Sequence, residues 1–232
     1  PIRVWKLDYT ISCLKTLDTM SEPSSVYVDF EEITRTKLCF LLRGIYVSEI
    51  AEFSKSNYAF PLTLLPITNG HVAFDKESGT LFAFFRASKT VNDFAIDLML
   101  YKTPCTRGGA CFAGPSRLAK RAGAEIRQVA LREEATSIVL TGASLGASIA
   151  AIAADELLDD ESITNSIDLI SFSSFGVGDI DFARRMSRCL RHAFYIRNIN
   201  DAVSAGFNAR IGIPILFDYD TESATDAHCS MA

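Results

Sequence analysis

The sequence predicts an α/β fold with a mainly parallel central sheet flanked by helices and an N-terminal helical segment. From residue 137 onward, short apolar runs alternate with helical patterns at the spacing of βαβ units. Upstream, two apolar runs separated by a turn signal indicate a β-hairpin beside the parallel strands. The 232 residues, 48% of them apolar, can bury one core, and no linker or repeat divides them. Residues 1–232 are therefore expected to form one domain.

The second half of the chain carries the alternating pattern. Strands are expected at 137–141, 167–172 and 193–198, and helices at 116–134, 145–158 and 180–190. Because each pair of strands is separated by a helix, the strands are expected to run parallel in one sheet.

The first half gives weaker patterns. Residues 1–60 are interpreted as mostly helical, because Leu38, Leu41, Leu42, Ile45 and Ile50 recur at helical spacing. The remaining expectations are a helix at 36–53, a hairpin of strands 71–75 and 80–86 around a turn at 76–79, a short helix at 94–100 and a loop at 101–115.

Composition limits the partners of this protein. A net charge of −5 without a basic run argues against nucleic acid, which needs a patch that neutralises phosphates. The uncharged stretch 135–154 is long enough for a membrane span, but Gly, Ser and Thr interrupt it. We expect a strand, a turn and a buried helix there, and no transmembrane span. Pro1–Thr10 lacks the apolar core of a secretory signal, so a soluble protein is expected, either secreted or cytoplasmic.

Six cysteines are present, and their spacing fits no zinc site. Cys105 and Cys111 are close enough in sequence to close a short loop by a disulfide, although cysteine at this density does not require one. No metal and no organic cofactor is expected.

The run Thr141-Gly142-Ala143-Ser144-Leu145-Gly146 fits a nucleophile elbow. It follows the apolar residues 138–140 and precedes the small-residue stretch 147–151. A nucleophilic serine on a strand-to-helix turn needs small neighbours, and the helix after it directs N–H groups at a developing anion. The alternative interpretation is a buried packing corner without chemistry.

A serine hydroxyl needs a base, and elbow enzymes carry the acid and then the histidine after the serine. Of the three histidines, His71 and His192 fit structural roles, which leaves His228. Asp201 stands out as the acid because it follows the predicted strand 193–198, and strand carboxyl ends gather functional groups. A turn aspartate bonded to its own backbone is an equal alternative, and the rival acids are Asp218, Asp220 and Asp226.

Four segments from residue 80 to the C-terminus resemble the lipase class 3 family of α/β-hydrolases. Residues 141–146 resemble the family's T-G-H-S-L-G elbow, and 84–88 resemble A-F-R-G-[ST], followed at 89–98 by a run similar to N-W-x-x-D-L. Residues 171–179 are similar to T-F-G-x-P-R-V-G-N, and 197–203 to the D-x-V-P stretch that carries the acid. The resemblance implies the α/β-hydrolase fold.

The resemblance also implies roles residue by residue. Ser144 matches the nucleophile, Asp201 the acid and His228 the base. Ser88 matches the oxyanion-hole residue, and the Leu145 backbone N–H is the second donor. The segment from Lys89 to about Leu100 matches the lid of many members.

The implied activity is hydrolysis of carboxylic esters of lipids or acylglycerols, including phospholipids, through an acyl-enzyme intermediate. The implied partners are an acyl-ester substrate and, peripherally, a lipid interface. The sequence departs from the family at Ala143, at Ala87 in place of Gly, at Phe175-Gly176 in place of Pro-Arg and at Ser204 in place of Pro. The Ala87 departure and the nearness of His228 to the end of the chain motivate an alternative, a lipase-like fold that serves as a binding or signalling module. A thioesterase or peptidase using the same triad is a weaker alternative.

Overall fold

The structure is a computed structural model that describes residues 3–6, 40–46, 48, 61–97, 99–205 and 209–218. Within these ranges the strands of the main sheet are β1 (Arg3–Lys6), β2 (Leu64–Ile67), β3 (Gly70–Asp75), β4 (Thr80–Phe85), β7 (Ser137–Ala143), β8 (Ser166–Phe172), β9 (His192–Asn198) and β10 (Ile213–Asp218). Their order across the sheet is β1-β10-β9-β8-β7-β4-β3-β2. The first six strands in this order, β1 to β4, pair in parallel. Strand β3 pairs antiparallel with β4, and β2 pairs antiparallel with β3.

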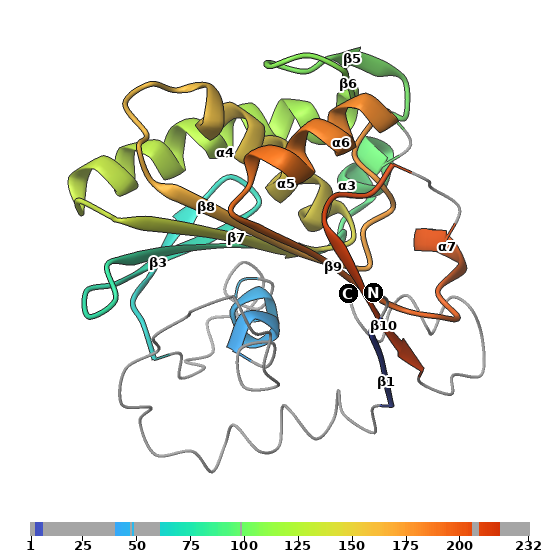
Figure 1. Cartoon of the computed structure of the whole chain (residues 1–232), viewed down its shortest axis with the longest axis horizontal. Helices are drawn as coiled ribbons and strands as arrows, with labels where there is room; N and C mark the ends of the chain where they lie inside the picture. Colours follow the sequence, from blue (N-terminus) through green and yellow to red (C-terminus); the bar gives the residue numbers. More distant parts are fainter. Residues whose placement is uncertain are drawn as a thin grey trace.

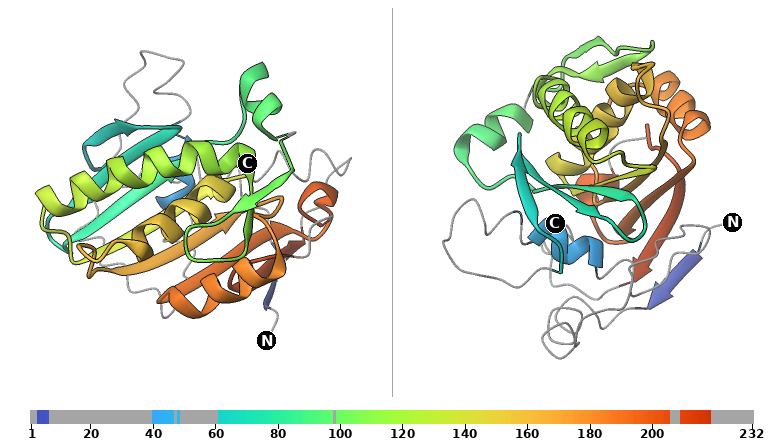
Figure 2. Two further views of the ribbon diagram at one scale, coloured as in Figure 1. Left: turned by 90° about the horizontal axis from the view of Figure 1, so that it is seen from above. Right: turned by 90° about the vertical axis from the view of Figure 1, so that its left-hand side faces the viewer.

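Helices cover both faces of this sheet. They are α3 (Val91–Asp97), α4 (Ala113–Arg132), α5 (Leu145–Asp159), α6 (Ile180–Cys189) and the short α7 (Ala202–Ala205). Helices α4, α5 and α6 lie on one face, and the helical residues 40–46 and 48 lie on the other (Figure 1). Seen from above, α4 and α5 run side by side across the sheet (Figure 2). A small hairpin, β5 (Lys102–Pro104) with β6 (Ala110–Phe112), joins α3 to α4.

Strand β4 shows how the sequence fills both layers. Alternate side chains of a strand point to opposite faces. Leu81, Ala83 and Phe85 therefore pack into the core under α4 and α5, whereas Phe82 and Phe84 pack into the second core with Phe40 of the opposite helix. An uninterrupted apolar strand is what a sheet covered on both faces requires.

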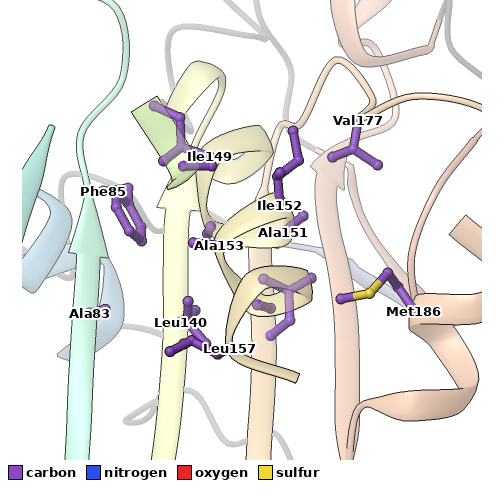
Figure 3. Packing of buried hydrophobic residues seen from close by; sticks show 14 of the residues in the cluster. Ala83, Phe85, Leu140, Ile149, Ala151, Ile152, Ala153, Leu157, Val177 and Met186 are labelled. Atoms are coloured by element: carbon purple, nitrogen blue, oxygen red, sulfur yellow. The ribbon is translucent and has the colours of Figure 1, made fainter. Parts of the chain in front are cut away.

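Helix α5 lies close to the sheet because its residues are small. Ile149, Ala153 and Leu157 of this helix share one core with Phe85 of β4 and Leu140 of β7 (Figure 3). Almost every residue of α5 is buried, including Ser148, whose hydroxyl donates to the carbonyl of Gly176 at 2.8 Å. This close packing fixes the first turn of α5 relative to the ends of the neighbouring strands.

The parallel half of the fold confirms the sequence prediction. The strands expected at 137–141, 167–172 and 193–198 are β7, β8 and β9, each longer by one or two residues, and the helices expected after residue 144 are α5 and α6. The hairpin at 71–75 and 80–86 is β3 and β4, and the helix expected at 36–53 is seen at residues 40–46 and 48. The rest of that helix lies outside the described residues.

Four expectations were wrong in detail. Residues 3–6 form a strand, not part of a helical segment, because β10 offers them an open parallel edge. The loop expected at 101–115 contains the β5–β6 hairpin, closed by a disulfide between Cys105 and Cys111. Helix α4 already starts at Ala113, since Pro115 falls in the first turn, where a missing N–H costs nothing. Helix α3 begins three residues before the expected 94–100 because Thr90 and Asp93 cap it.

No helix within the described ranges combines the length and apolar character needed to cross a membrane.

Candidate active site

Ser144 sits at the junction of β7 and α5 in a backbone conformation that few residues other than glycine adopt. Its φ is 51° and its ψ is −117°. Such a conformation costs roughly 1–3 kcal/mol and is retained where the surroundings impose it. Here the amide of Ser144 donates to the carbonyl of Phe172 at 3.0 Å, and its own carbonyl accepts from Ala147 and Ser148. The side chain is thereby held at the N-terminal end of α5, where the helix dipole favours negative charge.

The two glycines of the elbow are there because backbones approach too closely for any side chain. A Cβ at Gly142 would lie 2.4 Å from the carbonyl carbon and oxygen of Gly146. A Cβ at Gly146 would lie 2.4 Å from the carbonyl oxygen of Phe85 and 2.5 Å from that of Arg86. The G-x-S-x-G pattern thus places the loop after β4 directly against the first turn of α5.

That loop carries Ser88. It is held from the side by Asn69, whose carbonyl accepts the Arg86 N–H and whose amide group donates to the Arg86 carbonyl, both at 3.2 Å. The Ser88 hydroxyl donates to Asp97 at 2.7 Å. Ala87 is 5% exposed, its φ is not positive, and its methyl group belongs to the core that faces residues 40–45. An alanine is therefore accommodated without backbone strain where the family usually has glycine.

Leu145 is the first residue of α5 and is fully buried. Amides in the first turn of a helix have no acceptor within the helix. Its N–H is therefore available at the end of α5 that lies against the Ser88 loop, as an oxyanion donor must be.

Asp201 follows β9 and is completely buried. One of its carboxylate oxygens accepts the N–H of Ser204 at 3.0 Å, which caps α7. The ends of β7, β8 and β9 are tied together, because Ser144 N–H bonds to Phe172 and Ser173 N–H bonds to the carbonyl of Ile196 at 2.8 Å. Ser144 and Asp201 therefore lie at the same edge of the sheet, two strands apart. Asp201 is therefore a turn aspartate in that its Oδ1 bonds to the nearby backbone of Ser204. This bond does not exclude that the carboxylate also acts as the acid of a triad.

The candidate base, His228, lies outside the described residues, as do the rival acids Asp220 and Asp226 and the side chain of Asp218. The two described histidines are too far from Ser144. His192 pairs with Asp168, which pairs with Val139, five residues before the serine. At about 3.3 Å per residue this separation is roughly 16 Å.

His71 lies two strands from β7, paired with Phe84, which pairs with Thr141. That is roughly 10 Å across the sheet and roughly 10 Å along it from Ser144. The ring of His192 instead lies 3.1 Å from the Asp168 carboxylate, which also accepts from Arg191. Neither histidine of the described part of the chain can take a proton from Ser144.

A buried ion pair next to Ser88 was not predicted. Arg86 and Asp93, each with a side chain 6% exposed, are joined at 2.8 Å. Burial alone raises the pKa of the Asp93 carboxyl, but hydrogen bonds from Arg86, Lys89 and Thr90 outweigh it and lower this pKa to about 2. The sequence signal was the Thr90-x-x-Asp93 spacing of a helix cap, which the apolar residues from Phe94 onward obscured.

No group of three His, Cys, Asp or Glu side chains in the described ranges is arranged to hold a metal ion.

The comparisons with known proteins place this geometry in a family. The model of the family described as Lipase (class 3) matches residues 77–209. Among solved structures, the chain is similar to a triacylglycerol lipase from Penicillium expansum (TM-score 0.61, 19% identity, 83% of this chain and 82% of that one). It is also similar to the nonglycosylated LIP2 lipase of Yarrowia lipolytica (TM-score 0.64, 14% identity, 86% and 83%).

A third similar structure is the Rhizomucor miehei lipase propeptide complex (TM-score 0.61, 16% identity, 80% of this chain and 72% of that one). No curated protein sequence matches the chain significantly. At these identities the solved structures establish a shared α/β-hydrolase fold. Since the family match covers more than half of the 232 residues, the chain belongs to the class 3 lipases.

Proposed function

We propose that this protein hydrolyses carboxylic esters of lipids, with Ser144 as nucleophile, His228 as base and Asp201 as the acid that orients it. The observation that carries the proposal is the strained Ser144 at the start of α5, pressed by Gly146 against the loop that bears Ser88. A serine nucleophile requires such a turn, and backbone strain of this kind is typical of functional sites.

In the proposed reaction each of these residues has one role. Ser144 Oγ attacks the ester carbonyl carbon while His228 takes its proton. The charge that develops on the carbonyl oxygen is stabilised by the N–H groups of Ser88 and Leu145. As the bond to the alcohol breaks, His228 returns the proton to the leaving oxygen. Water, activated by the same histidine, then releases the acid from Ser144.

The base is assigned to His228 by two arguments. Of the three histidines in the sequence, the two described ones are held roughly 14–16 Å or more from Ser144. The residue also matches the family's histidine in position relative to Ser144 and Asp201. The buried Asp201 carboxylate lies at the edge of the sheet that the histidine has to reach.

A lipid substrate is supported by family membership and by the surface around the site. Val91 is 87% exposed at the start of α3, and Tyr101 is 61% exposed just after it. Ile199 and Val203, on either side of Asp201, are also exposed. Val91 comes three residues after Ser88, and Ile199 and Val203 flank Asp201, so these exposed apolar side chains suit an acyl chain or the surface of a lipid phase. One of the similar solved structures is described as a triacylglycerol lipase whose catalytic centre is a serine protease triad.

The proposal is tested with p-nitrophenyl esters and the Ser144→Ala variant. We expect kcat to fall on the order of 10⁴-fold or more, because removing the nucleophile leaves only binding and the oxyanion hole. Ser116→Ala is the matched control, since this hydroxyl of α4 is equally buried but donates to the carbonyl of Phe112, the residue that precedes the helix. It should retain wild-type activity within about threefold and lose about 1 kcal/mol of stability.

Two further variants separate the roles of acid and base. Asp201→Asn keeps the oxygen that caps α7 but removes the charge, so the fold should persist while kcat falls by up to about 10⁴-fold. His228→Ala should lower kcat by at least as much. Labelling of Ser144 by a fluorophosphonate probe, located by peptide mass spectrometry, reports the activated nucleophile directly. Folded wild-type protein that is neither labelled nor active would reject the hydrolase and favour a binding module.

A further inference from the structure

The carbonyl group of Ala87 accepts a hydrogen bond from its neighbour's side chain. Arg86 Nη1 donates to the Ala87 carbonyl oxygen at 2.9 Å, inside a region where both residues are 5% exposed. The same nitrogen donates to Asp93 Oδ2 at 2.8 Å, and Nη2 approaches Asp93 Oδ1 at 3.4 Å. The guanidinium group thus joins one backbone carbonyl to one carboxylate.

This carbonyl belongs to the peptide group that links Ala87 to Ser88. A peptide group is planar, and in the trans form its C=O and N–H point in opposite directions. No described peptide bond is cis. Fixing the direction of the Ala87 carbonyl therefore fixes the direction of the Ser88 N–H, which is the proposed oxyanion donor.

Asp93 is itself held firmly. Its Oδ2 accepts the backbone N–H of Lys89 at 3.0 Å and that of Thr90 at 2.9 Å, while its own N–H donates to Thr90 Oγ1 at 3.1 Å. These bonds form a reciprocal cap at the start of α3. The loop is consequently fixed on the side of Ser88 that leads into α3, and Asn69 fixes it on the side that leads from β4.

We propose that Arg86, anchored by Asp93, is a positioning residue that aims the Ser88 N–H at the developing oxyanion. The proposal rests on the proposed function, since it concerns the oxyanion hole of the same site. The reason is geometric: the carbonyl that the guanidinium holds belongs to the Ala87–Ser88 peptide group, whose N–H is the proposed oxyanion donor.

A second ion pair of the fold supplies a matched control. Arg185 donates to the buried Asp155 at 2.6 Å and to the backbone carbonyl of Gly108 at 2.9 Å. This pair therefore also links an arginine, an aspartate and a carbonyl group. It joins α6 to α5 and to the β5–β6 hairpin, away from the Ser88 loop.

The test compares Arg86→Met/Asp93→Asn with Arg185→Met/Asp155→Asn, each of which replaces an ion pair by neutral side chains. Activity is measured on an ester and on its thiono analogue, in which C=S replaces C=O. Sulfur is a weak hydrogen-bond acceptor, so the preference for the oxygen ester reports the quality of the oxyanion hole. For the Arg86 variant we expect kcat to fall roughly 10- to 100-fold with KM within about twofold, and the oxygen preference to fall about tenfold.

The control variant should lose stability but keep the wild-type preference for the oxygen ester. An equal loss of preference in both variants, or a folded Arg86 variant with wild-type kcat and preference, overturns the proposal. If the double variant does not fold, Arg86→Gln takes its place, because its amide ends two bonds short of Arg86 Nη1 and cannot reach the Ala87 carbonyl. Fluorophosphonate labelling of the wild type at Ser144 tests the hydrolase function separately, so the two failures are distinguishable.

Discussion

Gly146→Ala is the substitution for which the structure makes the sharpest prediction. The added Cβ would lie 2.4 Å from the Phe85 carbonyl oxygen and 2.5 Å from the Arg86 oxygen, both of them backbone atoms that no rotamer change can move. Restoring an ordinary contact of 3.4 Å displaces the loop by about 1 Å, and a misplacement of that size costs on the order of 100-fold in rate. Because the loop carries Ser88, we expect the loss in kcat.

Stability should fall as well, by about 1–3 kcal/mol, since the methyl group overpacks a closed region. Ester hydrolysis gives kcat and KM, and denaturant unfolding gives the free energy of unfolding. Gly123→Ala is the control, because its Cβ would lie 3.2 Å from Glu156 Cβ, a contact that a shift of a few tenths of an ångström relieves. This helical position of α4 should tolerate alanine, which gains up to about 1 kcal/mol in helix propensity.

The result that refutes this reasoning is a Gly146→Ala enzyme with wild-type kcat and wild-type stability. Such a variant would mean that the loop after β4 moves away freely, and the close approach in the structure would then have no part in placing Ser88.

Three further predictions follow from other parts of the structure. The pKa of Asp93 lies at about 2, below its ordinary 3.8, so the ionised carboxylate stabilises the fold above pH 4. About 2 kcal/mol of the free energy of unfolding is lost as the pH falls from 3.8 through 2. Urea unfolding across this range should show that loss in the wild type but not in Asp93→Asn. Replacing Cys105 and Cys111 by alanine should cost about 2 kcal/mol by the loop-entropy relation, whereas replacing the free, exposed Cys189 should change stability little, as thermal unfolding will report. His192→Ala should keep ester hydrolysis within about twofold of wild type, because this residue lies at the opposite end of the strands.

Strands β4, β7, β8 and β9 were predictable because burial on both faces gives them continuous apolar runs. Strands β2 and β10 were not, since Pro66 and Pro214 interrupt their patterns. The structure explains both prolines. Strand β2 is the edge of the sheet, and Pro214 precedes Ile215, where the pairing of β10 with β1 begins. Among the described residues, each proline lacks a strand neighbour on one side, where a missing N–H leaves no ladder bond unmade. A local sequence pattern cannot reveal where the neighbouring strands end.

The candidate site also contains features that a local sequence pattern predicts and features that it does not. That Ser144 and Asp201 lie at one edge of the sheet was predictable, because Ser144 directly follows β7, Asp201 comes three residues after the end of β9, and parallel strands bring their carboxyl ends to one edge of a sheet. The Arg86–Asp93 pair was not predictable. Seven residues separate the two side chains around a turn, and only the packing of the loop against α5 decides that both are buried.

Two departures from the family pattern have opposite physical meanings. At Ala87 the backbone is unstrained and the methyl group is buried in the core, so the lost glycine removes nothing that the Ser88 loop requires. At Ser173, where the family carries glycine, φ is 46°, which costs a non-glycine residue roughly 1–2 kcal/mol. That conformation is held by the bond from Ser173 N–H to Ile196, which joins the ends of β8 and β9. The fold thus keeps a strained residue at the edge of the sheet that carries Ser144 and Asp201. Ala87 therefore gives no support to an inactive protein, and His228 is the residue on which the distinction depends.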